Sequence, residues 1–252
     1  MLNTRKMLAV VGLCAAMLGG AANAADSTPV KVAVASNAAQ AVKKYGDPTR
    51  FEKVIQAFEA KDKTATPLPG GIVCIGSSSM ANWHPTIQQD LAPLKIIARG
   101  FGGSTMNDAA YYAERMVVRY RPKAVVLYEG DNDIGSGMSP KQICEAFESF
   151  VSTVQKGLPE ARIYVISIKP SLKRWNLWPT SVEANKLIAG VCAKDPNRLT
   201  YVSVVEGMLG TDGKVRDDIF RADKLHMTAK GYEIWKGALK PVLMAKEAIA
   251  SK

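Results

Sequence analysis

The sequence has few side chains of the kinds that bind metal ions. Histidine occurs only twice among 252 residues, as His84 and His226, and the four cysteines include no Cys-x-x-Cys pair. Zinc sites are built from clusters of these residues, so the sequence argues against one and we expect no metal. Cys74, Cys144 and Cys192 are widely spaced at apolar positions, so we expect small buried side chains, with at most one disulfide among them.

Long apolar runs are equally scarce. Beyond residue 24, no stretch of about 18 apolar residues occurs, which is the length that a membrane-spanning helix needs. Residues 1–24 differ: Arg5 and Lys6 precede an apolar stretch that ends before Ala22-Asn23-Ala24, as in a secretory signal. We therefore expect cleavage near Ala24 and export to the periplasm or the extracellular space, without stable membrane insertion.

No run of basic residues interleaved with aromatic residues occurs, although Lys and Arg outnumber Asp and Glu by 33 to 23. The formal net charge of +10 falls by two when Arg5 and Lys6 leave with the signal. Charges scattered in this way are typical of solvated helix faces, so we expect no binding to nucleic acid. Attraction to anionic surfaces is compatible with the excess of basic residues.

The remaining chain is predicted to contain a linker, residues 25–43, and one α/β domain, residues 44–252. Five short runs rich in Val and Ile lack strict polar alternation, as strands buried on both faces of a parallel sheet do. They are residues 71–75, 94–98, 124–128, 162–168 and 199–204. Because longer amphipathic stretches separate them, we expect a three-layer α/β/α sandwich with a five-stranded parallel sheet.

Helix signals lie between these runs. Ser139-Pro140 followed by Gln142 predicts a capped helix start, and Thr180 with Glu183 predicts another of the same kind. A helix is also expected from Arg50 onwards, and a last one over residues 228–250 should kink or break at Pro241. The predicted inward-facing residues of the helix after Arg50 are Val54, Ala57 and Phe58.

Polar, glycine-rich segments follow several of the runs, at the strand ends where such sheets bind ligands. Ser78 follows the first run and begins a helix, which would expose its hydroxyl group in front of a positive helix end. A serine nucleophile needs a base. His226 has Asp223 three residues before it, a spacing that lets a carboxylate hold the imidazole, whereas His84 is more typical of a surface or cap residue. The structural alternatives are a helix cap at Ser78 and a capping segment before Thr228.

A developing oxyanion needs preorganised hydrogen-bond donors. Gly103 can present its backbone amide without a side chain in the way, and Asn132 offers a side-chain amide at the end of the third run. Two competing motifs are incomplete. A dinucleotide fingerprint fails at Thr105, and a calcium loop fails at Ser136 and Gln142, where Gly and an acidic residue are needed.

Together, four ordered segments resemble the blocks of the SGNH hydrolase superfamily, also called GDSL-like lipases and acylhydrolases. The segments are Gly76-Ser77-Ser78-Ser79-Met80 with Trp83, Gly102-Gly103-Ser104-Thr105, Gly130-Asp131-Asn132-Asp133, and Asp223-Lys224-Leu225-His226. The resemblance implies a flavodoxin-like sheet and no cofactor. A further segment, residues 167–175, is similar to an exported bacterial subgroup of the superfamily.

The resemblance also implies a role for each residue of the site. Ser78 is the expected nucleophile, His226 its base and Asp223 the carboxylate that orients the base. Gly103, with Gly102 as the alternative, and Asn132 are the expected oxyanion donors beside the Ser78 amide. Ser77 departs from the Asp of the family's eponymous motif, as it does in many relatives of the acetylhydrolase type.

The expected function is hydrolysis of acyl esters of a small molecule or a glycan through a covalent acyl-enzyme. Short acyl groups are favoured because the loops at the strand ends are short and polar. Acyl transfer to a sugar or lipid hydroxyl, or a noncatalytic envelope- or glycan-binding module on this scaffold, are the alternatives. The tryptophans among the expected substrate contacts could instead fill the edge of the core. These expected contacts are Trp83, Lys169, Arg174, Trp175 and Trp178.

Overall fold

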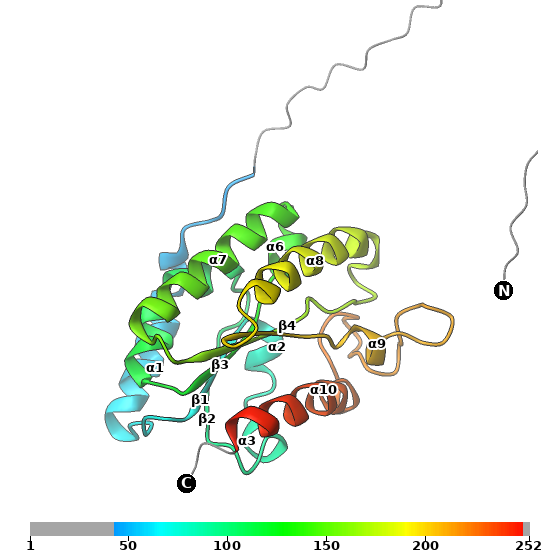
Figure 1. Ribbon diagram of the computed structural model, residues 1–252. Helices are drawn as coiled ribbons and strands as arrows, with labels where there is room; N and C mark the ends of the chain where they lie inside the picture. Colours follow the sequence, from blue (N-terminus) through cyan, green and yellow to red (C-terminus); the bar gives the residue numbers. More distant parts are fainter. Residues whose placement is uncertain (1–42, 249–252) are drawn as a thin grey trace, which may run out of the picture. The chain divides into compact units, whose positions relative to one another are not determined.

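The computed structural model describes residues 43–248 of the chain. The predicted signal segment and all but the last residue of the predicted linker lie outside this range. The described residues form an α/β/α sandwich, in which helices cover both faces of a parallel sheet (Figure 1). The predicted fold class is confirmed.

The sheet has five strands in the order β2-β1-β3-β4-β5, and each neighbouring pair is parallel. The strands are β1 (Ile72–Gly76), β2 (Ile96–Gly100), β3 (Ala124–Tyr128), β4 (Arg162–Ile166) and β5 (Leu199–Val202). Gly76 pairs with both Gly100 and Tyr128, so β1, β2 and β3 end at the same level. The loops that follow these three strands therefore meet at one edge of the sheet.

Each strand overlaps one predicted run, but β2 begins and ends two residues later than predicted. The strand includes Arg99, a residue that a search for apolar runs leaves out. Arg99 is buried because its guanidinium group pairs with Asp62 at 2.5 Å, and Asp62 also accepts a hydrogen bond from Tyr120. A charged residue can occupy a buried strand when its charge is paired in this way.

Successive residues of a strand face opposite sides of the sheet, and here both sides are packed. In β1, Val73 and Ile75 belong to one apolar core, whereas Ile72 and Cys74 belong to the other. This arrangement explains why the strands are apolar along their whole length. Cys74 and Cys192 are buried as predicted, Cys144 is partly exposed, and all three are free thiols.

The first core lies under α1 (Glu52–Thr64), α4 (Met106–Tyr111), α5 (Ala113–Met116), α6 (Asp131–Gly135), α7 (Pro140–Gly157) and α8 (Trp178–Lys194). The second lies under α2 (Ser78–Ala81), α3 (Ile87–Asp90), α9 (Val205–Met208) and α10 (Ala229–Glu247). Figure 1 shows α7 and α8 on one side of the sheet and α10 on the other. Three short 3-10 helices complete the described secondary structure: η1 (Pro48–Phe51), η2 (Val118–Tyr120) and η3 (Trp175–Leu177).

Several helix predictions need correction. α7 begins at the predicted capping box, but α8 begins at Trp178, two residues before Thr180, because the proline at position 179 fits the first turn of a helix. In α1 the buried apolar residue is Ile55, whereas Val54 is 42% exposed and Ala57 is exposed. The final helix, α10, continues through its internal proline at position 241 without a break.

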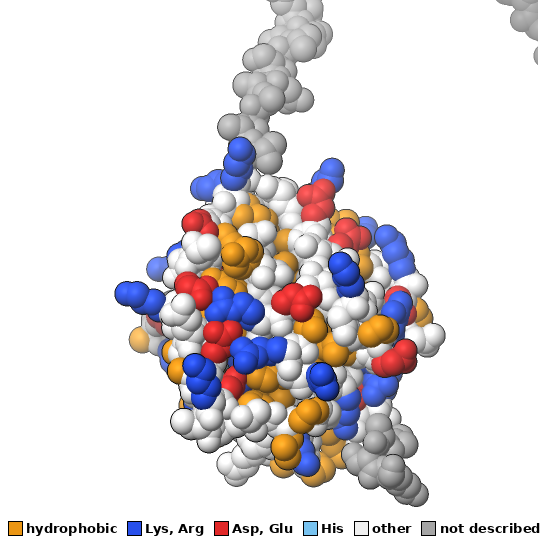
Figure 2. Space-filling model, turned by 90° about the vertical axis from the view of Figure 1, so that its left-hand side faces the viewer, with side chains coloured by type: hydrophobic (Ala, Val, Ile, Leu, Met, Phe, Trp, Pro, Cys, Tyr) orange, Lys and Arg blue, Asp and Glu red, His pale blue; other side chains and the backbone are white. Residues whose placement is uncertain are grey.

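Acidic and basic side chains are interspersed on the face of the molecule where α1 lies (Figure 2). Arg115, for example, pairs at 2.9 Å with both Glu52 and Glu59, which joins α5 to α1. At the far end of α10, the buried Glu247 pairs with Arg162 at 2.6 Å and accepts a hydrogen bond from Tyr164, which ties this helix to β4. None of the helices within residues 43–248 is long and apolar enough to cross a membrane.

Candidate active site

Two glycines set the position of Ser78. Gly76 ends β1 with φ of +152°, and a Cβ atom there would lie 2.2 Å from the carbonyl oxygen of Tyr128. A Cβ atom on Gly100 would lie 2.4 Å from the backbone nitrogen of Ala81 in α2. The absence of a side chain at Gly76 lets β1 end against β3, and its absence at Gly100 lets α2 pack directly against the end of β2. Ser78, the first residue of α2, therefore stands at the carboxyl edge of the sheet.

The side chains of Ser78, His226 and Asp223 form a chain of hydrogen bonds. Nε2 of His226 lies 2.9 Å from Oγ of Ser78, and Nδ1 of the same ring lies 2.7 Å from Oδ2 of Asp223. When Nδ1 carries the ring hydrogen and donates it to the carboxylate, Nε2 keeps a lone pair that can take the Ser78 proton. The expected base, His226, is thus within hydrogen-bond distance of both the expected nucleophile and the expected orienting carboxylate.

A tight turn holds Asp223 against the imidazole of His226. Oδ1 of Asp223 accepts the backbone N–H groups of Leu225 at 3.0 Å and of His226 at 2.9 Å, and Lys224 between them has φ of +60°. The hydrogen bond from the His226 ring, together with the two from the backbone, holds the pKa of Asp223 well below its usual range. Asp223 is therefore a carboxylate at neutral pH, able to stabilise an imidazolium.

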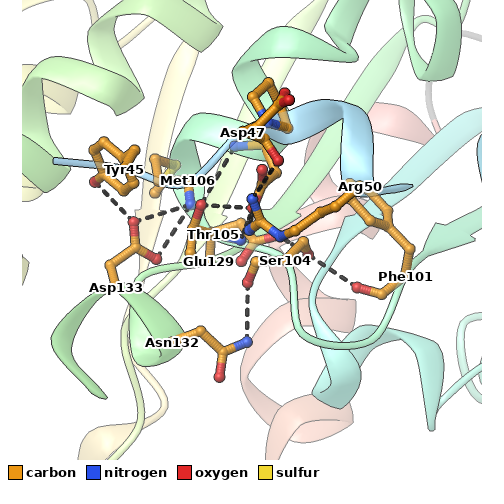
Figure 3. Close-up of polar contacts among 12 residues, drawn as sticks. Tyr45, Asp47, Arg50, Phe101, Ser104, Thr105, Met106, Glu129, Asn132 and Asp133 are labelled. Carbon is orange, nitrogen blue, oxygen red and sulfur yellow. Dashed lines mark hydrogen bonds and ion pairs between the residues drawn. The ribbon is translucent and has the colours of Figure 1, made fainter. Parts of the chain in front are cut away.

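Asn132 lies on α6, the short helix that follows β3 after a turn at Gly130, where φ is +105°. Its Nδ2 donates a hydrogen bond to the carbonyl oxygen of Ser104 at 2.9 Å (Figure 3), and its Oδ1 accepts one from Arg174 at 3.2 Å. These two contacts fix which way the amide faces. One N–H of Nδ2 is used by Ser104, which leaves the second to donate to a ligand.

Backbone amides supply further donors beside Ser78. A Cβ atom on Gly102 would lie 3.8 Å from Cβ of Ser78, so this glycine lies against the nucleophile. Gly103 has φ of +86°, a conformation that accounts for a glycine at that position. Within residues 43–248, the amides of Ser78, Gly102 and Gly103 have no hydrogen-bond acceptor. All three amides are free to donate to a ligand.

Lys169 lies in the interior and not at the surface of the site. The residue is only 2% exposed, and its Nζ lies 3.4 Å from Oδ2 of the buried Asp131. Arg174 contacts the same carboxylate at 2.7 Å and keeps 22% of its side chain exposed. Burial alone would raise the pKa of Asp131, but Lys169 and Arg174 lower it below its usual value. The expectation that Lys169 contacts a substrate is wrong, because its ammonium group is buried and forms an ion pair with Asp131.

The three tryptophans that were expected to contact a substrate divide into two groups. Trp83 is fully buried, stacks on Tyr232 with 5.6 Å between ring centroids and donates a hydrogen bond to Asp90 at 2.7 Å. A substrate contact for Trp83 is therefore wrong, and this side chain belongs to the core. Trp175 and Trp178 instead stack on each other with ring centroids 6.0 Å apart, and Trp175 is 39% exposed. Of these three tryptophans, only Trp175 and Trp178 are at least partly exposed.

His84 is half-buried, not the surface or cap residue that the sequence suggests. Its Nε2 accepts the backbone N–H of Gly100 at 2.9 Å. Burial, with Arg99 and Lys61 nearby, lowers the pKa of His84 to about 4. The imidazole of His84 therefore holds the end of β2 as a neutral acceptor, and His226 is the histidine that contacts Ser78.

The sequence matches the model of a known protein family. The model of the GDSL-like lipase/acylhydrolase family matches residues 74–234, a segment that contains Ser78, Asn132 and His226. The chain belongs to this family. As a member of the GDSL-like lipase/acylhydrolase family, it is assigned to the hydrolases of ester bonds. A search of curated proteins by sequence found no match.

Solved structures share the fold of this GDSL-like family member. A GDSL-like lipase from Bacteroides thetaiotaomicron is 18% identical over 79% of this chain and 98% of its own, with a TM-score of 0.62. A carbohydrate esterase family 3 protein from Talaromyces cellulolyticus is 17% identical over 72% and 100%, with a TM-score of 0.58. A mutant of an acetyl-xylooligosaccharide esterase from Geobacillus stearmophilus is 13% identical over 72% and 95%, with a TM-score of 0.55.

Sequence reasoning missed the buried acidic residues around Asn132. Asp133 accepts hydrogen bonds from the backbone of Met106 at 3.0 Å and from the Tyr45 hydroxyl at 2.8 Å (Figure 3), and burial raises the pKa of Asp133 to about 6. Glu129, directly after β3, lies 2.5 Å from Oγ of Ser104. Their position directly after a predicted buried strand was the one signal in the sequence. Acidic residues buried at such a place must be paired or lose their charge.

Proposed function

We propose that the protein is an exported serine esterase that hydrolyses acyl esters through Ser78, His226 and Asp223. The observation that carries this proposal is the pair of hydrogen bonds, 2.7 Å and 2.9 Å long, that joins Asp223 to His226 and His226 to Ser78. Membership of the GDSL-like lipase/acylhydrolase family supports the same reaction class.

In the first half of the reaction, Oγ of Ser78 attacks the carbonyl carbon of the ester while Nε2 of His226 takes the hydroxyl proton. The imidazolium that forms is stabilised by the charged Asp223. The tetrahedral intermediate collapses when the bond to the leaving alcohol breaks and His226 returns the proton to that alcohol oxygen. The acyl group remains on Ser78 as an ester.

In the second half, water attacks the acyl-enzyme and His226 accepts its proton. Collapse of the second tetrahedral intermediate releases the carboxylic acid and returns the proton to Oγ of Ser78. The oxyanion of both intermediates is held by the amides of Ser78 and Gly103 and by Nδ2 of Asn132. Preorganised donors of this kind contribute about 3–4 kcal/mol each to the transition state.

The proposed substrates are short acyl esters, acetyl to about butyryl, carried by a glycan or another small polar molecule. The stacked pair of exposed Trp175 and partly exposed Trp178 supports this choice, because aromatic faces bind sugar rings by stacking. Two proteins with the same fold bear the names carbohydrate esterase and acetyl-xylooligosaccharide esterase. Export is proposed from the signal pattern of residues 1–24.

The reaction is tested with p-nitrophenyl acetate. Ser78→Ala and His226→Ala should each reduce turnover by about four powers of ten or more, and the double variant should be scarcely worse, since nucleophile and base act as a unit. Ser149→Ala, at an exposed serine of α7, is the matched control and should keep full activity. An active Ser78→Ala protein, or losses that add in the double variant, would remove Ser78 from the nucleophile role.

The substrate class is tested separately with p-nitrophenyl esters of about two to sixteen carbons. We expect kcat/KM to be highest at two to four carbons, and Trp175→Ala to weaken the hydrolysis of acetylated oligosaccharides more than that of p-nitrophenyl acetate. A maximum at about ten carbons or beyond contradicts the short-acyl proposal. Product analysis with an added sugar acceptor distinguishes hydrolysis from acyl transfer. The absence of any Ser78-dependent turnover would favour a binding module.

A further inference from the structure

The hydroxyl group of Ser104 lies between two oxygen atoms that both require a hydrogen. Its Oγ is 2.5 Å from Oε1 of Glu129 and 2.9 Å from the carbonyl oxygen of Phe101 (Figure 3). A serine hydroxyl carries one hydrogen and can donate it to only one of them. The carbonyl group of Phe101 cannot donate. The second hydrogen bond is therefore possible only when Glu129 itself carries a proton.

The surroundings of Glu129 also favour the neutral acid. The residue is 1% exposed, and within the described chain its Oε2 has no hydrogen-bond partner. No Lys or Arg among the described residues forms an ion pair with it, and a buried carboxylate without a partner is costly. Burial, and next the charge of Asp133, raise the pKa of Glu129 well above its usual value.

The charged groups that face Glu129 come from two helices, α4 and α6. Asp108 of α4 and Asp131 and Asp133 of α6 are all acidic and disfavour a further negative charge. The nearby Lys and Arg side chains form ion pairs with other carboxylates. Arg50 pairs with Asp108 at 2.5 Å, whereas Lys169 and Arg174 pair with Asp131 at 3.4 Å and 2.7 Å.

A proton on Oε1 of Glu129 allows both contacts of the Ser104 hydroxyl to be hydrogen bonds. Glu129 then donates to Oγ of Ser104, and Ser104 donates its own hydrogen to the carbonyl oxygen of Phe101. The carbonyl oxygen of Ser104 in turn accepts the hydrogen bond from Nδ2 of Asn132. Ser104 thus joins the end of β3, the turn that contains Gly103, and the side chain of Asn132.

We propose that Glu129 is a positioning residue of the esterase: as a neutral carboxylic acid it donates a hydrogen bond to Ser104 and thereby holds the oxyanion donors Gly103 and Asn132 in place. This inference rests on the proposed function, because it assigns a purpose to Glu129 only if an oxyanion forms at Ser78. Glu129 does not touch the substrate, so its effect should fall on kcat and leave KM unchanged.

The test compares two replacements of nearly the same shape. Glu129→Gln keeps a donor, since its amide can donate to Oγ of Ser104, and it cannot ionise. Glu129→Met fills the space but makes no hydrogen bond of this kind. Glu247→Gln is the matched control, because Glu247 is also fully buried but lies at the end of α10, where it pairs with Arg162.

With p-nitrophenyl acetate, Glu129→Gln should keep kcat within about threefold of wild type. Glu129→Met should lower kcat about tenfold or more at constant KM. This decrease is smaller than the one expected when a whole oxyanion donor is removed. Ser104→Ala should resemble Glu129→Met, and combining the two should add little. Glu247→Gln should lower thermal stability and keep kcat. Equal losses in Glu129→Gln and Glu129→Met would show that a charge is needed at this position and would overturn the proposal. Full activity in Glu129→Met, or a change confined to KM, would overturn it too.

A spectroscopic measurement does not depend on turnover or on the folding of Glu129→Met. At about pH 8, where ordinary glutamates are ionised, the infrared difference spectrum of wild type minus Glu129→Gln should contain the C=O stretching band of a protonated carboxyl group. Absence of this band contradicts the proposal. If Ser78→Ala keeps full activity, the proposed function fails while the infrared result still decides the protonation of Glu129. If Ser78→Ala is inactive and Glu129→Met is fully active, only the present inference fails.

Discussion

Replacing Arg174 with alanine should lower kcat about tenfold and leave KM nearly unchanged. The guanidinium group of Arg174 contacts two residues of α6, the carboxylate of Asp131 at 2.7 Å and Oδ1 of Asn132 at 3.2 Å. The second contact holds the amide of Asn132 so that its Nδ2 faces Ser104 and the proposed oxyanion. Arg174 therefore acts through Asn132.

The expected magnitude follows from the strength of that one contact. A hydrogen bond from a charged donor to a neutral acceptor contributes about 1.5–3 kcal/mol. The lower value applies because the bond is 3.2 Å long and 22% of the Arg174 side chain is exposed. About 1.4 kcal/mol corresponds to a factor of ten in rate. The loss stays below that of removing Asn132, since Ser104 still holds Nδ2 in the variant.

The assay is steady-state hydrolysis of p-nitrophenyl acetate by the wild type, Arg174→Ala and Arg174→Lys. Lysine keeps a positive charge near Asp131 but cannot contact Asp131 and Asn132 together as the planar fork of arginine does, so an intermediate kcat is expected. The competing expectation from the sequence is that Arg174 binds a polar or anionic leaving group. In that case KM would rise in Arg174→Ala and kcat would stay the same, a result that refutes the positioning argument.

Four further predictions concern other parts of the molecule. Asn132→Ala should reduce kcat by about a hundredfold or more with the fold intact by circular dichroism, and a change in KM alone would contradict its place among the oxyanion donors. The folded-state pKa of His84, about 4, lies below that of the unfolded chain, so wild type should lose stability as pH falls from about 6.5 to about 4. His84→Gln, which keeps an acceptor for Gly100, should flatten this dependence in melting curves measured across that range, and an unchanged slope would argue against it. Glu247→Gln should lower the free energy of unfolding in urea by about 2–3 kcal/mol, because it weakens the charged contacts with Arg162 and Tyr164, and an unchanged midpoint would show that the ion pair contributes nothing. EDTA should leave the esterase rate unchanged, and loss of activity with recovery on adding zinc or calcium would overturn the expectation of metal-free catalysis.

The parts of the fold that sequence patterns predict are those where burial acts on a whole segment. β1 and β3 are apolar along their length because both faces of the sheet are covered, so their runs stand out. β2 is harder to place, since Arg99 is buried only by virtue of its pairing with Asp62, a residue 37 positions earlier. Such a pairing leaves no local signal in the sequence.

The same distinction separates the predicted from the missed residues of the site. The spacing of Asp223 and His226 is a local pattern, so the contact between them was predictable. Whether a single tryptophan or lysine next to the site faces solvent depends on what packs over it. Trp83 is covered by Tyr232 and Trp235, and Lys169 by its pairing with Asp131, all from segments distant in the chain.

The contact between Ser78 and His226 joins segments that are 148 residues apart in the chain. The loop that carries His226 is anchored by an antiparallel bridge between Phe220 and Met227 and by the backbone bond from Lys173 to the carbonyl oxygen of Lys224 at 2.9 Å. The sheet, by contrast, is complete at β5, before this loop begins. A chain cut between β5 and the loop would therefore keep every strand and the nucleophile but lack the base. Ester turnover on mixing this fragment with the remaining piece of the chain would therefore report the docking of α10 and the His226 loop onto the sheet.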